Sequence, residues 1–192
     1  MRHLIILLTS AALLVSPTVG RAQSLLTDAV DVGGFVALDA DIGHVNGGSA
    51  VLSGAEIGML LNHRFSLGLT GAGLVSDDDS PSPTSDLRRF GYGGISLGYV
   101  VAPASTLHYL ADILVAGGSV RPEPDLAADA EGDGDRLFVV RPSIAAEVNI
   151  SRHVRATAGI SYRAVSGVDT AGLSNADLSG FAIRLVIKAG RF

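Results

Sequence analysis

The segment Leu137–Ala164, LFVVRPSIAAEVNISRHVRATAGISYRA, decides the fold of this chain. Apolar residues occupy every second position from Phe138 to Ile150, and the pattern restarts at Val154. Successive side chains of a β-strand point to opposite faces, so this alternation predicts two amphipathic strands. At about 3.3 Å per residue, each strand is long enough to cross a bilayer when tilted. The three-residue link 151–153 joins them as an antiparallel hairpin, which is typical of a transmembrane β-barrel.

The N-terminus has the features of a secretory signal. A short basic start is followed by the apolar stretch Leu4–Val15, and the small residues Gly20 and Ala22 suit cleavage before Gln23. The apolar stretch is too short to span a bilayer as a helix. We therefore expect a signal peptide over residues 1–22 and an outer-membrane β-barrel domain over residues 23–192.

Composition excludes several classes of protein. The chain has 14 Lys and Arg against 19 Asp and Glu, a net charge of −5, and loss of a signal containing Arg2 and Arg21 makes it more acidic. This balance opposes nucleic-acid binding. Because there is no cysteine, the chain has no disulfide framework and no cysteine-based metal or redox site.

The same alternation recurs along the rest of the chain. It predicts strands at about 32–43, 50–61, 65–75, 90–101 and 107–120 before the hairpin, and at about 180–189 after it. The count is eight, and the links alternate in length so that both chain ends fall on the side with the short turns, as in outer-membrane barrels. The expected fold is all-β, an eight-stranded antiparallel up-and-down transmembrane β-barrel. Pro142 removes a ladder hydrogen bond, so we expect a bulge or an irregular pairing there.

The inward face of this barrel carries the charged residues. If Ile150 pairs with Val154, Arg141 stands opposite Arg163, while Glu147 lies diagonal to Arg155. Closure of the barrel is expected to bring the acids of the first strand to the basic residues of the last. Eight strands leave no room for a wide channel, so a salt-bridge network that plugs the lumen is favoured over a conducting pore. The predicted lumen charge network comprises Asp39, Asp41, Glu56, Arg141, Glu147, Arg155, Arg163, Arg184 and Lys188.

Other candidate sites carry weaker signals. The long links are acidic and are expected to be solvated loops, with Asp77–Asp79 in one of them. Asp133-Gly134-Asp135 resembles a calcium loop only faintly, since it lacks the ordered spacing and the terminal Glu. The four histidines of the mature chain form no Ser-His-acid arrangement that spacing reveals. We therefore expect no catalytic group, no metal and no cofactor. Six outward aromatic residues are expected to form interfacial girdles: Phe65, Tyr99, Tyr109, Phe138, Tyr162 and Phe181.

Three stretches carry a resemblance to a known group. FGYGGISLGY at 90–99, ISYRAVSG at 160–167 and FAIRLVIKAGRF at 181–192 resemble small eight-stranded outer-membrane β-barrels. The group is that of the outer-membrane protein A transmembrane domain and its uncharacterised single-barrel relatives. The resemblance implies the fold, a Gram-negative outer-membrane location, contact with membrane lipid and assistance from the barrel assembly machinery, which commonly reads a C-terminal aromatic. Phe192 is present, one residue out of register with the apolar face of its strand.

The predicted function is structural or surface-interacting. We expect a monomer whose acidic extracellular loops meet an unidentified partner. One alternative is a small pore or a conduit for an apolar ligand. Another is a soluble periplasmic lipid-binding barrel with the faces inverted, so that Arg141, Glu147, Arg155 and Arg163 would lie in water.

Overall fold

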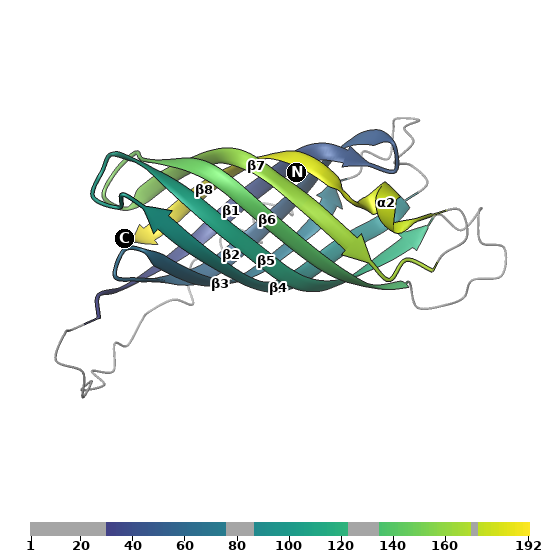
Figure 1. The fold of residues 1–192 in the computed structure, drawn as a ribbon, viewed down its shortest axis with the longest axis horizontal. Helices are drawn as coiled ribbons and strands as arrows, with labels where there is room; N and C mark the ends of the chain where they lie inside the picture. The colour runs from purple at the N-terminus through teal and green to yellow at the C-terminus, as the bar shows by residue number, and fades with distance from the viewer. Residues whose placement is uncertain (1–29, 76–86, 123–134, 170–172) are drawn as a thin grey trace, which may run out of the picture.

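Eight antiparallel strands close into a barrel in the computed structural model, which describes residues 30–75, 87–122, 135–169 and 173–192 (Figure 1). Each strand pairs with its neighbours in sequence, and β1 pairs with β8 to close the sheet. The predicted fold class is confirmed. The strands are β1 (Val32–Val45), β2 (Gly48–Leu61), β3 (Phe65–Val75), β4 (Leu87–Val101), β5 (Leu107–Pro122), β6 (Asp135–Asn149), β7 (Val154–Ser166) and β8 (Gly180–Arg191).

The two ends of the barrel differ. One, here called the α2 end, carries the β1–β2 turn and the short helix α2 (Asn175–Leu178) (Figure 1). The other, here called the terminal end, carries the C-terminus and the links 62–64, 102–106 and 150–153. Asn46 and Gly47 both have positive φ, of 51° and 74°, as a two-residue hairpin turn requires. No helix among the described residues is long and apolar enough to cross a membrane.

Several strands are longer than the sequence indicates. β4 begins at Leu87, β5 runs to Pro122 and β6 begins at Asp135, so each extends into a predicted loop. Near the α2 end, these strands carry arginines instead of apolar residues at outward positions. The apolar alternation therefore stops before the strands do. At Pro142 the β6–β7 ladder is interrupted: pairing stops after Val140 and resumes at Ser143 in the same register. The result is an irregular pairing without a bulge.

The outer wall is apolar and the inner face holds the charges. Large outward side chains such as Leu69, Ile144 and Ile183 are more than half exposed, at 62%, 61% and 56%. Arg141 and Glu147, in contrast, are 0% and 1% exposed. The inverted barrel considered above is therefore wrong, because its supposedly solvated residues are buried. Residues 1–22, the predicted signal, lie outside the described residues.

The outward aromatic residues form two groups. Phe65, Tyr99 and Tyr109 lie near the terminal end on β3, β4 and β5, and the rings of Phe65 and Tyr99 are 5.1 Å apart. The other three are near the α2 end, on β6, β7 and β8, where the rings of Tyr162 and Phe181 are 4.8 Å apart. The predicted girdle residues thus occupy opposite ends and different arcs of the wall.

Inside the barrel, apolar layers lie on both sides of the charges. The larger layer, towards the α2 end, is a buried cluster that includes Leu52, Leu114, Val139 and Leu178 of α2. The smaller layer, towards the terminal end, consists of two clusters around Phe35 and Leu110, and Phe192 packs against both. Alternation alone does not predict these layers, because apolar residues on the inward face interrupt the polar pattern there.

Candidate functional site in the barrel lumen

The nine residues of the predicted lumen network all point inward, from five different strands. Eight of them are buried, and the side chain of the ninth, Glu56, is 9% exposed. Alternation along each strand places them there, because every one occupies the phase opposite to the apolar wall. Contacts across the lumen then divide them into two clusters and one separate arginine, which register alone does not reveal.

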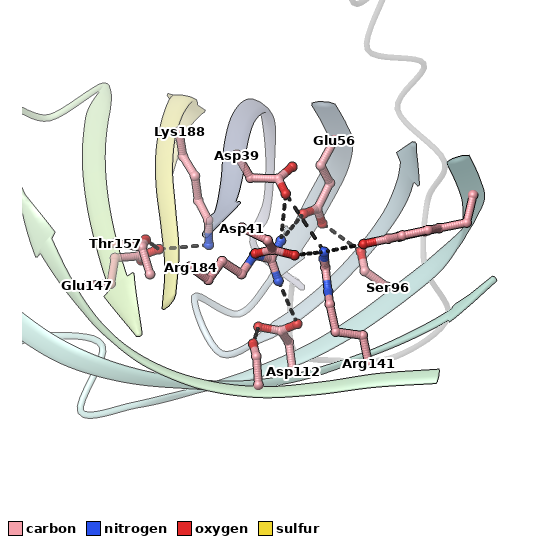
Figure 2. A network of polar contacts seen from close by, with 12 residues as sticks. Asp39, Asp41, Glu56, Ser96, Asp112, Arg141, Glu147, Thr157, Arg184 and Lys188 are labelled. Carbon is pink, nitrogen blue, oxygen red and sulfur yellow. Dashed lines mark hydrogen bonds and ion pairs between the residues drawn. The ribbon is translucent and has the colours of Figure 1, made fainter. Parts of the chain in front are cut away.

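The first cluster, here called the Arg141–Arg184 cluster, joins β1, β2, β5, β6 and β8 (Figure 2). Arg141 binds Asp41 with an N–O distance of 2.6 Å and donates a hydrogen bond to the Tyr92 hydroxyl at 3.2 Å. Arg184 lies 3.1 Å from Asp112 and 3.9 Å from Asp41. The two guanidinium groups thus form ion pairs with several carboxylates, at different distances.

The outer members of this cluster are held in different ways. Glu56 accepts a hydrogen bond from Ser96 at 2.6 Å and lies 3.9 Å from Arg184. Asp39 is 3.8 Å from Arg141 and 4.0 Å from Arg184, and neither of its oxygens has a hydrogen-bond partner in the structure. Its attraction to the arginines is therefore purely electrostatic.

The second cluster is centred on Glu147 and lies apart from the first (Figure 2). One carboxylate oxygen is 3.0 Å from both His108 and Arg155. The other oxygen is 2.8 Å from Lys188 and accepts a hydrogen bond from Thr157 at 3.0 Å. The expected pairing of Glu147 with Arg155 is present in the structure. Lys188, which we expected near Asp39 and Asp41, binds Glu147 instead.

Arg163 stands outside both clusters. It donates hydrogen bonds to the backbone carbonyls of Leu178 at 2.7 Å and His44 at 3.3 Å, and its guanidinium lies 5.4 Å from the Phe90 ring centre. The like-charge opposition to Arg141 expected from the register is relieved in this way. The Arg141 side chain points to Asp41, whereas the Arg163 side chain points to the backbone of Leu178 at the α2 end.

Sequence reasoning left out several polar members of the site. Asp112, His108, Ser96, Ser143 and Thr157 all take part in these contacts. The available signal was their phase, since Asp112 and His108 share the inward face of β5. Leu110 between them and Leu114 after Asp112 concealed it.

Little space remains among these side chains. A polar cavity of about 20 Å³ is lined by residues of both clusters, including Glu56, Asp112 and Lys188. A second, of about 10 Å³, lies beside Phe192 at the terminal end. Volumes of this size hold about one water molecule.

Comparison with solved structures gives the same architecture. The chain is similar to Neisserial surface protein A. The two share 13% sequence identity with a TM-score of 0.53, and the alignment covers 84% of this chain and 99% of the other. At this identity the likeness concerns the fold. No protein-family model matches the chain, and no curated protein matches it.

The chemistry that this site supports is electrostatic. His108 faces the Ser105 carbonyl oxygen with one ring nitrogen and Glu147 with the other, both at 3.0 Å, so neither nitrogen faces a hydroxyl nucleophile. Within the described ranges, no group of three His, Cys, Asp or Glu residues is arranged to hold a metal ion. Asp133 and Gly134 of the faint calcium pattern lie outside the described residues, as do Asp77–Asp79.

Proposed function

We propose that this protein is an integral outer-membrane β-barrel of a Gram-negative bacterium with a structural or surface-interaction role and no catalytic activity. The observation that carries this proposal is the contrast between the two faces of the sheet. Large apolar side chains cover the outer wall, while the charged residues are buried inside. Exposed apolar surface on this scale is unfavourable in water and favourable in lipid. A closed barrel also leaves no unpaired strand edge in the hydrocarbon.

The orientation follows from the ends of the barrel. In such proteins the short turns face the periplasm and the longer loops face outward. The α2 end would then be extracellular, and the terminal end periplasmic. We propose that residues 1–22 are the signal peptide that directs this route, that the mature chain is a monomer, and that the barrel assembly machinery inserts it.

Fractionation tests the location. The mature protein should remain with the outer membrane, need detergent for extraction, and migrate differently on a gel with and without heating. A protein extracted without detergent would contradict the proposal.

We further propose that the lumen is closed to ions. The Arg141–Arg184 cluster and the Glu147 cluster fill the middle of the barrel between the two apolar layers, and the cavities among them are water-sized. An ion entering this path would displace packed apolar side chains and meet charges that are already paired. The alternative is a small pore or apolar-ligand conduit.

Single-channel recording separates the two. The wild-type protein in a planar bilayer should show no steady conductance steps. The double variant Leu110→Ala/Leu114→Ala thins one apolar layer at each end and should increase ion leakage. Ile113→Ala is the matched control, because the same strand points that side chain outward. Steady conductance by the wild type would contradict closure.

The surface role is assigned to the acidic loops at the α2 end. Asp77–Asp79 and the acids between 123 and 135 would present negative charge to the exterior, and a partner with a basic surface fits them. Replacing Asp77, Asp78 and Asp79 with Asn should weaken binding of such a partner and reduce its salt dependence. Unchanged binding would place the contact elsewhere on the protein.

A further inference from the structure

A side-chain-free area lies on the outer wall near the α2 end, on three adjacent strands. Gly71 of β3 is opposite Gly93 of β4, which in turn is opposite Gly117 of β5. One ladder step closer to the α2 end, Gly73, Gly91 and Ser119 form a second row. One step towards the middle of the barrel, the corresponding outward positions of the same strands carry the large apolar residues Leu69, Ile95 and Val115.

Packing accounts for little of this pattern: among these outward glycines, only Gly91 would bring an added Cβ closer than 3.4 Å to another atom, at 3.3 Å from a backbone oxygen. A Cβ atom added at Gly71 would meet nothing within 4 Å, and at Gly117 the nearest atom would be 4.0 Å away. The inward glycines of β4 and β5 behave differently: a Cβ at Gly94 would clash with the backbone oxygen of Val115, and one at Gly118 with that of Gly91. Close approach of the paired strand requires these inward glycines, whereas the outward ones leave backbone open to close approach by another molecule.

The bare area forms a shallow hollow with a basic border. The hollow is about 640 Å³ in volume and is lined by residues of β4, β5 and β6, among them Gly91, Gly93, Gly117, Ser119 and Arg136. Gly71 and Gly73 of β3 extend the bare surface beside it, outside its lining. Arg136 is opposite Ser119 in the ladder. Arg89 and Arg121 stand opposite each other across β4 and β5, two residues beyond the second row. All three arginines are exposed and occupy the outward phase.

On β4 and β5, these arginines stand where an aromatic girdle would be expected near the α2 end. At the α2 end the outward aromatic residues are on β6, β7 and β8, whereas β4 and β5 carry arginines at the corresponding height. Three arginines close to one another on the outer wall make this arc basic and favour an anionic ligand over a neutral one. A guanidinium group also binds phosphate through two parallel hydrogen bonds.

We propose that this hollow binds a phosphorylated glycolipid of the outer leaflet, with acyl chains over the glycines and a phosphate among Arg89, Arg121 and Arg136. Neighbouring strands are about 4.8 Å apart, so an area three strands wide exceeds the width of a single acyl chain. A headgroup that carries several chains fits it better than a two-chain phospholipid does. The choice of leaflet rests on the orientation proposed above.

Native mass spectrometry of the folded protein in an uncharged detergent tests the site. The probes are bisphosphorylated lipid A, the same molecule without phosphates, and phosphatidylglycerol, each added at equal concentration. We expect the lipid A adduct to exceed the other two. Arg89→Gln/Arg136→Gln should weaken it by about tenfold or more, because hydrogen bonds to charged groups are lost. Gly93→Leu/Gly117→Leu should also weaken it, by filling the hollow, since both glycines line it and a Cβ at either would have no atom closer than 3.4 Å.

Matched controls lie at the terminal end. Gly34 is outward and exposed with room for a Cβ, whose nearest atom would be 3.9 Å away, and Arg152 is exposed in the β6–β7 link. Gly34→Leu and Arg152→Gln should leave the adduct unchanged. Equal binding of phosphatidylglycerol would overturn the glycolipid assignment, and undiminished binding by both double variants would overturn the site. The gel shift on heating, measured on the same samples, reports folding independently of lipid binding.

Discussion

Glu147 shows how a single carboxylate organises one layer of the lumen. His108, Arg155, Thr157 and Lys188 all approach it at 2.8–3.0 Å from three other strands, and it is 1% exposed. A buried cation without a counter-charge is far more costly than one that is paired. Glu147 therefore compensates several basic groups at once.

Replacing Glu147 with Gln should lower the free energy of unfolding by about 3–5 kcal/mol, because the basic residues around it lose their counter-charge. Urea unfolding in lipid vesicles, followed by circular dichroism, measures the change. Glu56→Gln is the control: the ion pair of Glu56 with Arg184 is long, at 3.9 Å, and an amide oxygen can still accept the hydrogen bond from Ser96, so a loss of about 1 kcal/mol is expected. Equal effects of the two substitutions would show that Glu147 has no special role.

Phe192 has a structural role inside the barrel. Its ring turns inward, 4.0 Å from the Arg155 guanidinium carbon and 6.4 Å from the Phe35 ring. We expect Phe192→Ala to destabilise the refolded barrel by about 1–2 kcal/mol through loss of this cation–π contact, with Phe192→Tyr close to wild type. Because refolding into vesicles needs no assembly machinery, the same experiment separates this role from a recognition signal. An unchanged unfolding curve for the Ala variant would contradict it.

At the level of residues, the sequence predicted well which face of the sheet each charged residue occupies. It predicted less well which other residues each one contacts. Alternation alone placed Asp41, Arg141 and Arg184 inside. It did not reveal that Arg141 of β6 reaches Asp41 of β1, because that contact crosses the lumen and depends on the stagger of the closed sheet. Lys188 pairs with Glu147 rather than with Asp39 or Asp41 for the same reason, and alternation does not show that the Phe192 ring turns inward.

At the level of elements, α2 is the part that alternation could not predict. Four residues, Asn175–Leu178, form a helix within a stretch expected to be a plain loop. Leu178 is fully buried in the apolar layer, and Arg163 and Asn46 bond to the backbone of the α2 residues Leu178 and Asp177. The fold of this segment depends on contacts with the barrel mouth, which a local pattern does not contain.

Asp177 makes the start of α2 sensitive to acid. Its carboxylate accepts hydrogen bonds from the Ser174 hydroxyl at 2.7 Å and the Ser174 backbone N–H at 2.8 Å, and these bonds hold the pKa of Asp177 below its usual value of 3.8. A lowered pKa means that the stabilisation is complete above the usual carboxyl range and is lost as the pH falls through the folded-state pKa.

An NMR titration measures this directly. The amide signal of Ser174 should shift with a midpoint below pH 3.8, and the transition should be absent in Asp177→Asn. A midpoint at the ordinary value would mean that the two hydrogen bonds do not favour the ionised form.

At the level of the whole molecule, outward residues lie at different heights along the barrel axis. In a membrane, the cost of placing a charge at such a position should depend on its depth in the bilayer. Leu69 lies mid-strand on β3 and is paired with Ile57 and Ile95, whereas Leu107 begins β5 at the terminal end beside the girdle residue Tyr109. Both leucines point outward and are at least half exposed. They therefore differ mainly in their distance from the end of the barrel.

Leu69→Arg should destabilise the barrel in vesicles by about 2–4 kcal/mol, because an arginine at the bilayer midplane is costly, while Leu107→Arg should cost about 0–1 kcal/mol near the interface. Reversible urea unfolding in phospholipid vesicles gives both values. In detergent micelles, whose apolar thickness adapts to the protein, the difference should shrink. Equal costs in vesicles would mean that the apolar wall is not placed across a bilayer, because a wall covered uniformly by any other apolar partner has no depth dependence.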